Sequence, residues 1–262
     1  MNRVVLLTVN VLGTGPEEAA HPGATLFARF AHGRYAYRVG LARLLDYLKR
    51  MEIPATFFWP AVEAQRRPAL LQRCLEGGHE VASHGYAFED HSALGDREPE
   101  VLAAAHEALT RLAGAPPLGF RAPHGLLSIK TLGLLHALGC RYDSSFIDDD
   151  SPYLLDDDGG TGMVELPLNQ WLIDASHFGR KLTQARAEAF MREEFDALIE
   201  ESGYACLVLH PRADIGVARA ARLEMMTRLL ERAQTFSVTF QRCGDYAAAL
   251  LEARRTAAAA SP

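Results

Sequence analysis

The chain alternates short hydrophobic runs with longer stretches in which hydrophobic positions recur every three or four residues. Residues 4–11 read VVLLTVNV, which is typical of a strand buried on both faces. Within residues 39–50 the leucines have helical spacing, and charged side chains occupy the other positions: Leu41, Leu44, Leu45 and Leu48. The two patterns keep alternating along the chain. The sequence therefore predicts an α/β protein.

Seven strands and seven helices follow from this pattern. The predicted strands span 4–11, 55–59, 79–83, 118–121, 141–143, 163–167 and 205–210, with a further extended segment at 236–240. The predicted helices span 39–50, 68–75, 99–113, 128–138, 182–202, 217–234 and 245–255. Strict alternation implies parallel strands joined by right-handed crossovers. The number of units favours a single distorted (β/α) barrel of about seven parallel strands over an open sheet.

Composition narrows the class of protein. We expect one domain over residues 1–262, with a core at about 3–251 and a flexible, alanine-rich tail at 256–262. The net charge of −6 argues against a nucleic-acid partner. Neither a GxGxxG nor a GxxxxGK[ST] motif occurs, which disfavours dinucleotide and P-loop sites. The four cysteines form no CxxC pair, so we expect separate thiols in a reducing compartment.

We expect neither a signal peptide nor a transmembrane helix. The N-terminal apolar run is shorter than that of a signal peptide, and no window approaches 18 uninterrupted apolar residues. We therefore expect a cytoplasmic protein with no membrane partner. The stretch 26–37 is apolar and aromatic enough to form the interface of a homo-oligomer.

Polar side chains follow the predicted strands, which is where catalytic residues gather in a barrel. Three apolar strands end in the segments VASHGY, LGFRAPHG and CLVLHPR. A single histidine there is more often a core or surface residue without a catalytic role, but the joint pattern favours a site. The residues concerned are Asn10, His84, Tyr86, Arg121, His124, Asp148, Trp171, Asp174 and His210.

Several of these segments resemble the motifs of one family. GHEVASHGY, GFRAPHG, YDSSFIDDDSPYL, VELPLNQWLID and LVLHPR are similar, in order and approximate spacing, to those of the NodB-homology polysaccharide deacetylases of carbohydrate esterase family 4. The resemblance covers residues 3–251 or so. It implies a distorted barrel with fewer than eight complete units. It also implies a hydrolase that cleaves a non-peptide carbon–nitrogen bond.

The metal positions of that family are altered here. Metal-using members carry two aspartates after the first strand, a general base and a metal ligand, and two ligating histidines after the third. This chain has Asn10 and Leu12 at the first pair, and His84 and Phe88 at the second. Leucine and phenylalanine offer no lone pair to a cation, and a zinc site needs three protein ligands. We expect no metal cofactor, with zinc or another divalent cation held by His84 and His91 as the alternative.

The altered positions resemble the metal-independent, allantoinase-like branch, through VNVLGTG, SHGYAFED and YDSSFIDDDSPY. The expected function is therefore a metal-independent amidase of the allantoinase or cyclic-imide type. One alternative is a metal-dependent N-deacetylase of an amino sugar or polysaccharide. A second is a catalytically inactive, deacetylase-like binding protein. The expected partner is a small-molecule amide or N-acyl sugar.

Amide hydrolysis without a metal needs a side-chain base, an acid and an oxyanion donor. We expect His84 and His210 to share the base and acid roles, and the resemblance favours His210 as the acid. Asn10 supplies an amide donor for the oxyanion. Arg121 either binds a substrate carbonyl or carboxylate, or serves as a structural partner of Asp143.

The remaining strand-end residues are expected to bind substrate. They are Tyr86, His124, Asp148, Trp171 and Asp174. For Trp171, packing in the core is at least as well supported as contact with substrate. Asp148 belongs to an acidic loop, for which a solvent-exposed turn is an equally good interpretation.

Overall fold

A curled sheet of mostly parallel strands forms the centre of the protein, a computed structural model that describes residues 3–25, 27–28, 31–155 and 162–260. The sheet order is β6-β7-β5-β4-β3-β2-β1-β8, and β9 pairs with β1. The strands are β1 (Val4–Asn10), β2 (Thr56–Trp59), β3 (Glu80–Ser83), β4 (Gly119–Phe120), β5 (Tyr142–Asp143), β6 (Tyr153–Leu154), β7 (Val164–Glu165), β8 (Tyr204–Leu209) and β9 (Thr239–Gln241).

The curl of this sheet confirms the predicted distorted (β/α) barrel. An isolated parallel bridge between Ile173 and Val208 links the chain that follows β7 to β8, on the other side of the barrel. Strand β1 has β8 along one edge. Its other edge is shared by β9, which pairs with its first half, and β2, which begins opposite Thr8. The short antiparallel strand β6 lies next to β7 and was not predicted, because two residues carry no periodicity.

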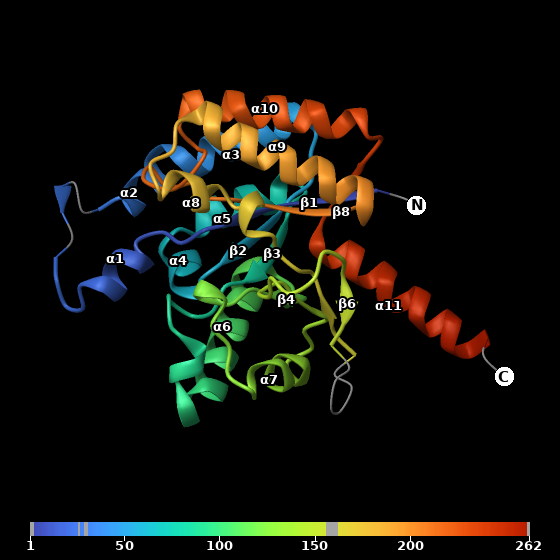
Figure 1. Ribbon diagram of the computed structural model, residues 1–262. Coiled ribbons are helices and arrows are strands. Elements are labelled where there is room, and N and C mark those ends of the chain that lie inside the picture. The colour runs from blue at the N-terminus through green and yellow to red at the C-terminus, as the bar shows by residue number, and fades with distance from the viewer. Residues whose placement is uncertain (1–2, 26, 29–30, 156–161, 261–262) are drawn as a thin grey trace.

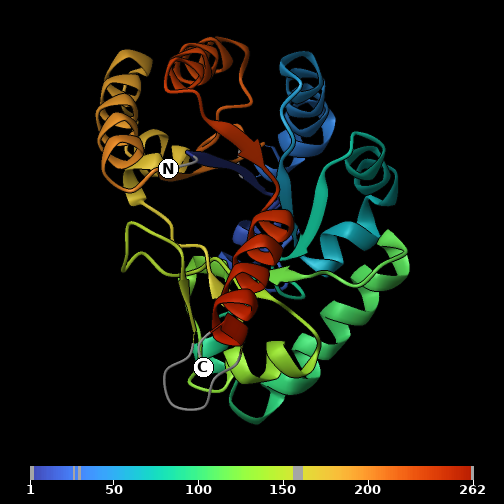
Figure 2. The ribbon, with the colours of Figure 1, turned by 90° about the vertical axis from the view of Figure 1, so that its right-hand side faces the viewer.

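Helices surround the sheet, as Figures 1 and 2 show. Helices α3, α9 and α10 lie together over one side, while α6 and α7 lie on the opposite side (Figure 1). The longer helices are α3 (Leu41–Met51), α5 (Pro68–Glu76), α6 (Glu98–Ala113), α7 (Thr131–Ala137), α9 (Gln184–Glu201), α10 (Ala220–Thr235) and α11 (Cys243–Ala260). The shorter ones are α1 (Gly15–Ala20), α2 (Gly33–Tyr35), the π-turn Ala36–Gly40, α4 (Ala61–Arg66) and α8 (Asp174–Phe178).

Helix α11 closes the end of the barrel at which the parallel strands begin. The amide of Cys243 donates to Thr56 Oγ1 at 2.9 Å, and that of Gly244 donates to Glu80 Oε2 at 2.9 Å. The helix continues to Ala260, so the tail that was expected to be flexible from 256 is helical that far. Alanine has the highest helix propensity, which accounts for the extension. None of the described helices is long and apolar enough to cross a membrane.

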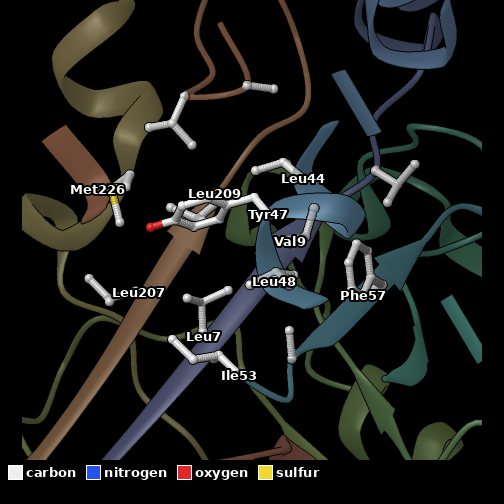
Figure 3. Close-up of a cluster of buried hydrophobic side chains, with 14 of the residues drawn as sticks. Leu7, Val9, Leu44, Tyr47, Leu48, Ile53, Phe57, Leu207, Leu209 and Met226 are labelled. Atoms are coloured by element: carbon white, nitrogen blue, oxygen red, sulfur yellow. The ribbon is translucent and has the colours of Figure 1, made fainter. Parts of the chain in front are cut away.

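The alternation of β1 determines what faces the site. Val5, Leu7 and Val9 point outward into the core beneath the helices, where Leu7 and Val9 lie among leucines of α3 and β8 (Figure 3). Val4 and Leu6 point into the barrel. Because successive side chains alternate, the inward row continues to Thr8 and then Asn10, where the strand ends. The inward-facing side chains of β1 are therefore apolar at its start and polar at its end, at Thr8 and Asn10.

Leu7 gives a test of this core. We expect Leu7→Ala to lower the free energy of unfolding by about 2–5 kcal/mol, because the side chain is fully buried and would leave a cavity. Chemical denaturation measures the change. Ile129→Ala, at a fully exposed side chain, serves as the control and should change it by less than about 0.5 kcal/mol. Equal effects of the two substitutions would contradict this description of the core.

Candidate active site

A cavity of about 400 Å³ lies at the carboxyl ends of the strands, opposite the end closed by α11. Its polar lining comes from the ends of β1, β3, β4, β5 and β8. These side chains are Asn10, His84, Arg121, His124, Ser145 and His210. The structure thus brings five of the nine predicted site residues into one wall.

His210 is held by a buried carboxylate. Its Nδ1 donates to Asp174 Oδ1 at 2.5 Å, and its backbone amide donates to Asp174 Oδ2 at 2.8 Å. The amide of Val217 also donates to Oδ2, at 2.9 Å. A neutral imidazole with its proton on Nδ1 carries a lone pair on Nε2. The contact with Asp174 therefore selects the tautomer in which Nε2 accepts a proton. Asp174, predicted to bind substrate, instead lies behind His210.

Asn10 faces His210 with its amide nitrogen. Its Nδ2 lies 3.5 Å from His210 Nε2, and its Oδ1 accepts a hydrogen bond from Arg121 Nη1 at 2.9 Å. Because the guanidinium is only a donor, this bond assigns the carbonyl end of the Asn10 side chain. The amide NH₂ group is therefore directed at the imidazole.

All five N–H donors of Arg121 have partners. Besides Asn10, they are Thr8 Oγ1 at 2.9 Å, the carbonyl and Oγ of Ser144 at 2.9 and 2.8 Å, and Cys206 Sγ at 3.7 Å. The guanidinium carbon also lies 4.0 Å from the ring centre of Phe58. Arg121 is buried and has no donor left for a substrate. None of these bonds goes to Asp143, the structural partner that the sequence offered as an alternative, although the Arg121 charge acts to lower the pKa of that carboxyl.

His84 presents its second nitrogen to the same cavity. Its Nδ1 donates to the backbone carbonyl of Arg121 at 2.6 Å, so Nε2 carries the lone pair. Burial lowers the pKa of His84 to about 3, and the nearby Arg121 charge acts in the same direction. His84 is therefore neutral across the ordinary pH range. It is an acceptor of hydrogen bonds, with no proton to deliver from Nε2.

The donor groups of the cavity do not fit the family's metal site. Leu12 and Phe88, which the resemblance aligns with two metal ligands, line it, and Phe88 packs edge-on against His124 at 4.5 Å between ring centres. His91 is fully buried outside the wall, with its nitrogens 3.7 Å from Glu89 and 3.6 Å from Glu98. Within the described part of the chain, no group of three His, Cys, Asp or Glu side chains is placed to hold a cation.

Three side chains expected to bind substrate lie outside the wall. Tyr86 packs against the outer core, and Asp148 accepts a hydrogen bond from Tyr153 at 3.0 Å on the surface. Trp171 packs beside Phe190, at 5.6 Å between ring centres, and His177, at 6.2 Å. Their position in the sequence after a strand brings these residues near the site, but it does not determine which way their side chains point.

Arg212 joins two segments of the rim and was not anticipated, although it belongs to the LVLHPR motif. It donates to Glu17 Oε2 at 2.7 Å and to the carbonyl of Gly13 at 2.7 Å. It also pairs with Asp214 at 2.9 Å. This buried ion pair holds the 12–17 segment, which supplies Leu12 and Pro16, against the segment after β8, which supplies Ile215.

A pair of buried carboxyl groups supports the opposite side of the site. Asp143 and Glu165 are register partners on β5 and β7. The amide of Ser145 donates to both, at 3.0 and 3.1 Å. Glu165 Oε2 accepts no hydrogen bond, and burial together with the Asp143 charge raises the pKa of Glu165 well above its usual range. Burial also raises the pKa of Asp143, to about 6. We infer that Glu165 keeps its proton and donates it to Asp143.

Comparison with known proteins finds deacetylases and an allantoinase that are similar in sequence and fold. A family model described as polysaccharide deacetylase matches residues 31–142. The chain is 31% identical to a protein from Mycobacterium smegmatis assigned as a polysaccharide deacetylase, whose crystal structure covers 96% of this chain and 91% of its own, with a TM-score of 0.85. The crystal structure of Puue allantoinase is 26% identical, covering 93% of this chain and 88% of its own, with a TM-score of 0.80.

Curated relatives match over a shorter part of the chain. The peptidoglycan deacetylase of Helicobacter pylori is 34% identical over 125 residues, which is 47% of this chain and 43% of that protein. The chain thus spans less than half the length of that relative. The matched family region includes His84 and Arg121 but neither Asn10 nor His210.

The carboxyl pair gives a pH-dependent prediction. The folded chain binds the Glu165 proton more tightly than the unfolded chain, so the unfolding free energy falls as pH rises above about 4.3 toward the raised pKa. In Glu165→Gln the amide donates to Asp143 without titrating. The unfolding free energy of the variant minus that of the wild type should therefore rise by up to about 1.4 kcal/mol per pH unit between about pH 5 and pH 7.

Denaturant titrations at several pH values measure that gap. Glu107→Gln, at an exposed side chain of α6, is the matched control and should leave the pH dependence unchanged. Parallel curves for wild type and Glu165→Gln would show that Glu165 is ionised in the folded protein.

Proposed function

The chain belongs to the polysaccharide deacetylase family, and we propose that it hydrolyses the amide bond of a small N-acyl compound, using protein groups in place of a family-type metal site. The observation that carries the proposal is the His210–Asp174 pair, whose Nε2 faces the cavity with a single protein contact, to Asn10 Nδ2 at 3.5 Å. The names of the matched family and of its relatives support removal of an N-acyl group. The sequence analysis placed an allantoinase-type amidase first and had N-deacetylation as its alternative, in a metal-dependent form acting on an amino sugar or polysaccharide.

In the proposed mechanism His210 moves the proton. Its Nε2 takes a proton from water as the water oxygen attacks the acyl carbon, and Asp174 stabilises the charged ring. His84 accepts a hydrogen bond from the same water and orients it. The Asn10 amide donates to the oxygen on which negative charge develops. His210 then returns the proton to the departing nitrogen, the carbon–nitrogen bond breaks, and a carboxylic acid and an amine leave.

The sequence left the base and acid roles unassigned between the two histidines. The low pKa of His84 makes it a poor carrier of a proton, whereas the hydrogen bond from His210 Nδ1 to Asp174 leaves His210 Nε2 as an acceptor at the cavity. We therefore place both proton transfers on His210. This interpretation gives His84 an orienting role and keeps Arg121 as the group that positions Asn10.

Ring opening of a cyclic imide or ureide is the second candidate. The likeness to Puue allantoinase over 93% of this chain favours it. The residues of the proposed mechanism would catalyse ring opening in the same roles: His210, Asp174, His84 and Asn10. Metal-dependent deacetylation has less support, because Leu12 and Phe88 give the cavity no ligands at those positions. Saturable binding without turnover of any amide would instead favour the inactive binding protein.

Substitution of the dyad tests the proposal. We expect His210→Ala to lower kcat/KM by about a thousandfold or more, and Asp174→Asn to lower it by about a hundredfold or more, because the tautomer is lost. His136→Ala, at an exposed histidine of α7, is the control and should retain activity. Full activity of His210→Ala with a normally folded chain would refute the assignment.

Chelation tests the absence of a metal step. Activity on an N-acyl or cyclic imide substrate should survive exhaustive dialysis against a strong chelator, since the proposed base and oxyanion donor are side chains. Zinc added afterwards should not raise the rate. Loss of activity on dialysis and its recovery with zinc would overturn the metal-free mechanism, while amide hydrolysis itself would stand.

A further inference from the structure

We propose that the substrate of this cavity is uncharged and, apart from one amide or imide group, apolar, so that a sugar chain is not its preferred ligand. The inference rests on the proposed amide hydrolysis and adds the chemical class of the compound. It follows from which polar side-chain atoms of the cavity wall can still bind a ligand, once their hydrogen bonds within the protein have been assigned.

The wall offers no unpaired charge. Among the described residues that line it there is no carboxylate and no lysine. Its guanidinium, Arg121, has a partner for each of its five donors, and the Asp174 carboxylate lies behind His210. A charged substrate would lose its water without meeting an opposite charge, which is strongly unfavourable. The cavity therefore selects neutral compounds.

Three polar side-chain atoms of the buried wall can still bind a ligand, which is enough for a single amide. They are the Nε2 atoms of His84 and His210 and the amide nitrogen of Asn10, which lies 3.5 Å from His210 Nε2 and has a second hydrogen to donate. Ser145 carries the one side-chain hydroxyl among the described lining residues, and its Oγ donates to Asp143 and accepts from the amide of Ala122. His124 remains, at an exposed position. A sugar ring has several hydroxyls, and those buried without a partner lose their hydrogen bonds to water.

The rest of the lining is apolar and comes from separate segments of the chain. Leu12 and Pro16 follow β1, Phe88 follows β3, Leu168 and Ile173 follow β7, and Ile215 follows β8. Aliphatic or aromatic surface on the ligand gains from contact with such side chains. A cavity of about 400 Å³ is at the small end of ligand sites, which span about 300–1,000 Å³. One ring with a short substituent fits this volume better than an oligomer.

A matched pair of probes tests the inference. N-cyclohexylacetamide and N-acetylglucosamine both carry an acetamido group on a six-membered ring, and they differ mainly in the hydroxyl groups and ring oxygen. We expect kcat/KM to be higher for the cyclohexyl compound by about 100-fold, the effect of burying two or more unpaired hydroxyls. Calorimetric titration of the wild-type protein with each probe gives affinities that do not depend on turnover.

The outcomes separate the two proposals. Preference for N-acetylglucosamine or its oligomers, in rate or affinity, would overturn the inference and leave amide hydrolysis standing. Tighter binding of the cyclohexyl probe with no hydrolysis of either would support the inference and count against the proposed function. Binding of neither probe would overturn the inference.

Two variants test whether the apolar side chains of the cavity wall cause the preference for the cyclohexyl probe. Ile147 lines the cavity but is 63% exposed, so Ile147→Ser should fold normally, and Ile215→Ser tests a less exposed lining residue. We expect each to weaken binding of the cyclohexyl probe by about 3- to 10-fold without weakening that of N-acetylglucosamine. Ile129→Ser, at a fully exposed residue outside the lining, is the matched control. Equal weakening of both probes by the lining variants would contradict the apolar selection.

Discussion

The buried guanidinium of Arg121 is the constraint on which the arrangement of the site depends. A charge inside a barrel is tolerated only where its hydrogen bonds are satisfied. Thr8, Asn10, Ser144 and Cys206 supply the acceptors, from three different strands or strand ends, and Phe58 supplies a ring face. Meeting that requirement fixes the amide of Asn10. Arg121, for which the sequence left substrate binding and a structural role open, thus positions the side chain of Asn10.

Two polar networks converge on the contact between Asn10 and His210. On one side, the Asp143–Glu165 pair holds the backbone after β5, whose Ser144 holds Arg121. On the other side, Asp174 holds both the ring and the backbone of His210. Each network consists of groups buried beneath the cavity, so the atoms that face a ligand are few. Most of the polar groups hold other residues in place and do not face the cavity. The wall therefore has a small polar end and apolar sides.

The family relationship and the site chemistry therefore have to be argued separately. The curled barrel is shared with proteins named for deacetylation and with an allantoinase, and one fold supports many reactions. Leu12 and Phe88 place hydrocarbon in the cavity at two positions that the resemblance to metal-using members aligns with ligands. The same two side chains give the cavity much of its apolar character. In the proposal made above, Leu12 and Phe88 therefore have two effects: they supply no metal ligands, and they favour an apolar substrate.

The sequence by itself determined the order of strands and helices and the edge at which the site lies. Hydrophobic periodicity is local, so the long elements were predicted to within a few residues, whereas β6 and α4 are too short for it to show. Asn10, His84, His124 and His210 could likewise be placed, because parallel strands bring their ends together.

Only the tertiary structure decided which side chains face the cavity and which support it. Trp171 follows a strand as His210 does, yet it turns toward Phe190. The partners of Arg121 and the proton of Glu165 depend on residues far apart in the chain. Side-chain direction and burial arise from packing between such segments, and no periodicity within a single segment records them.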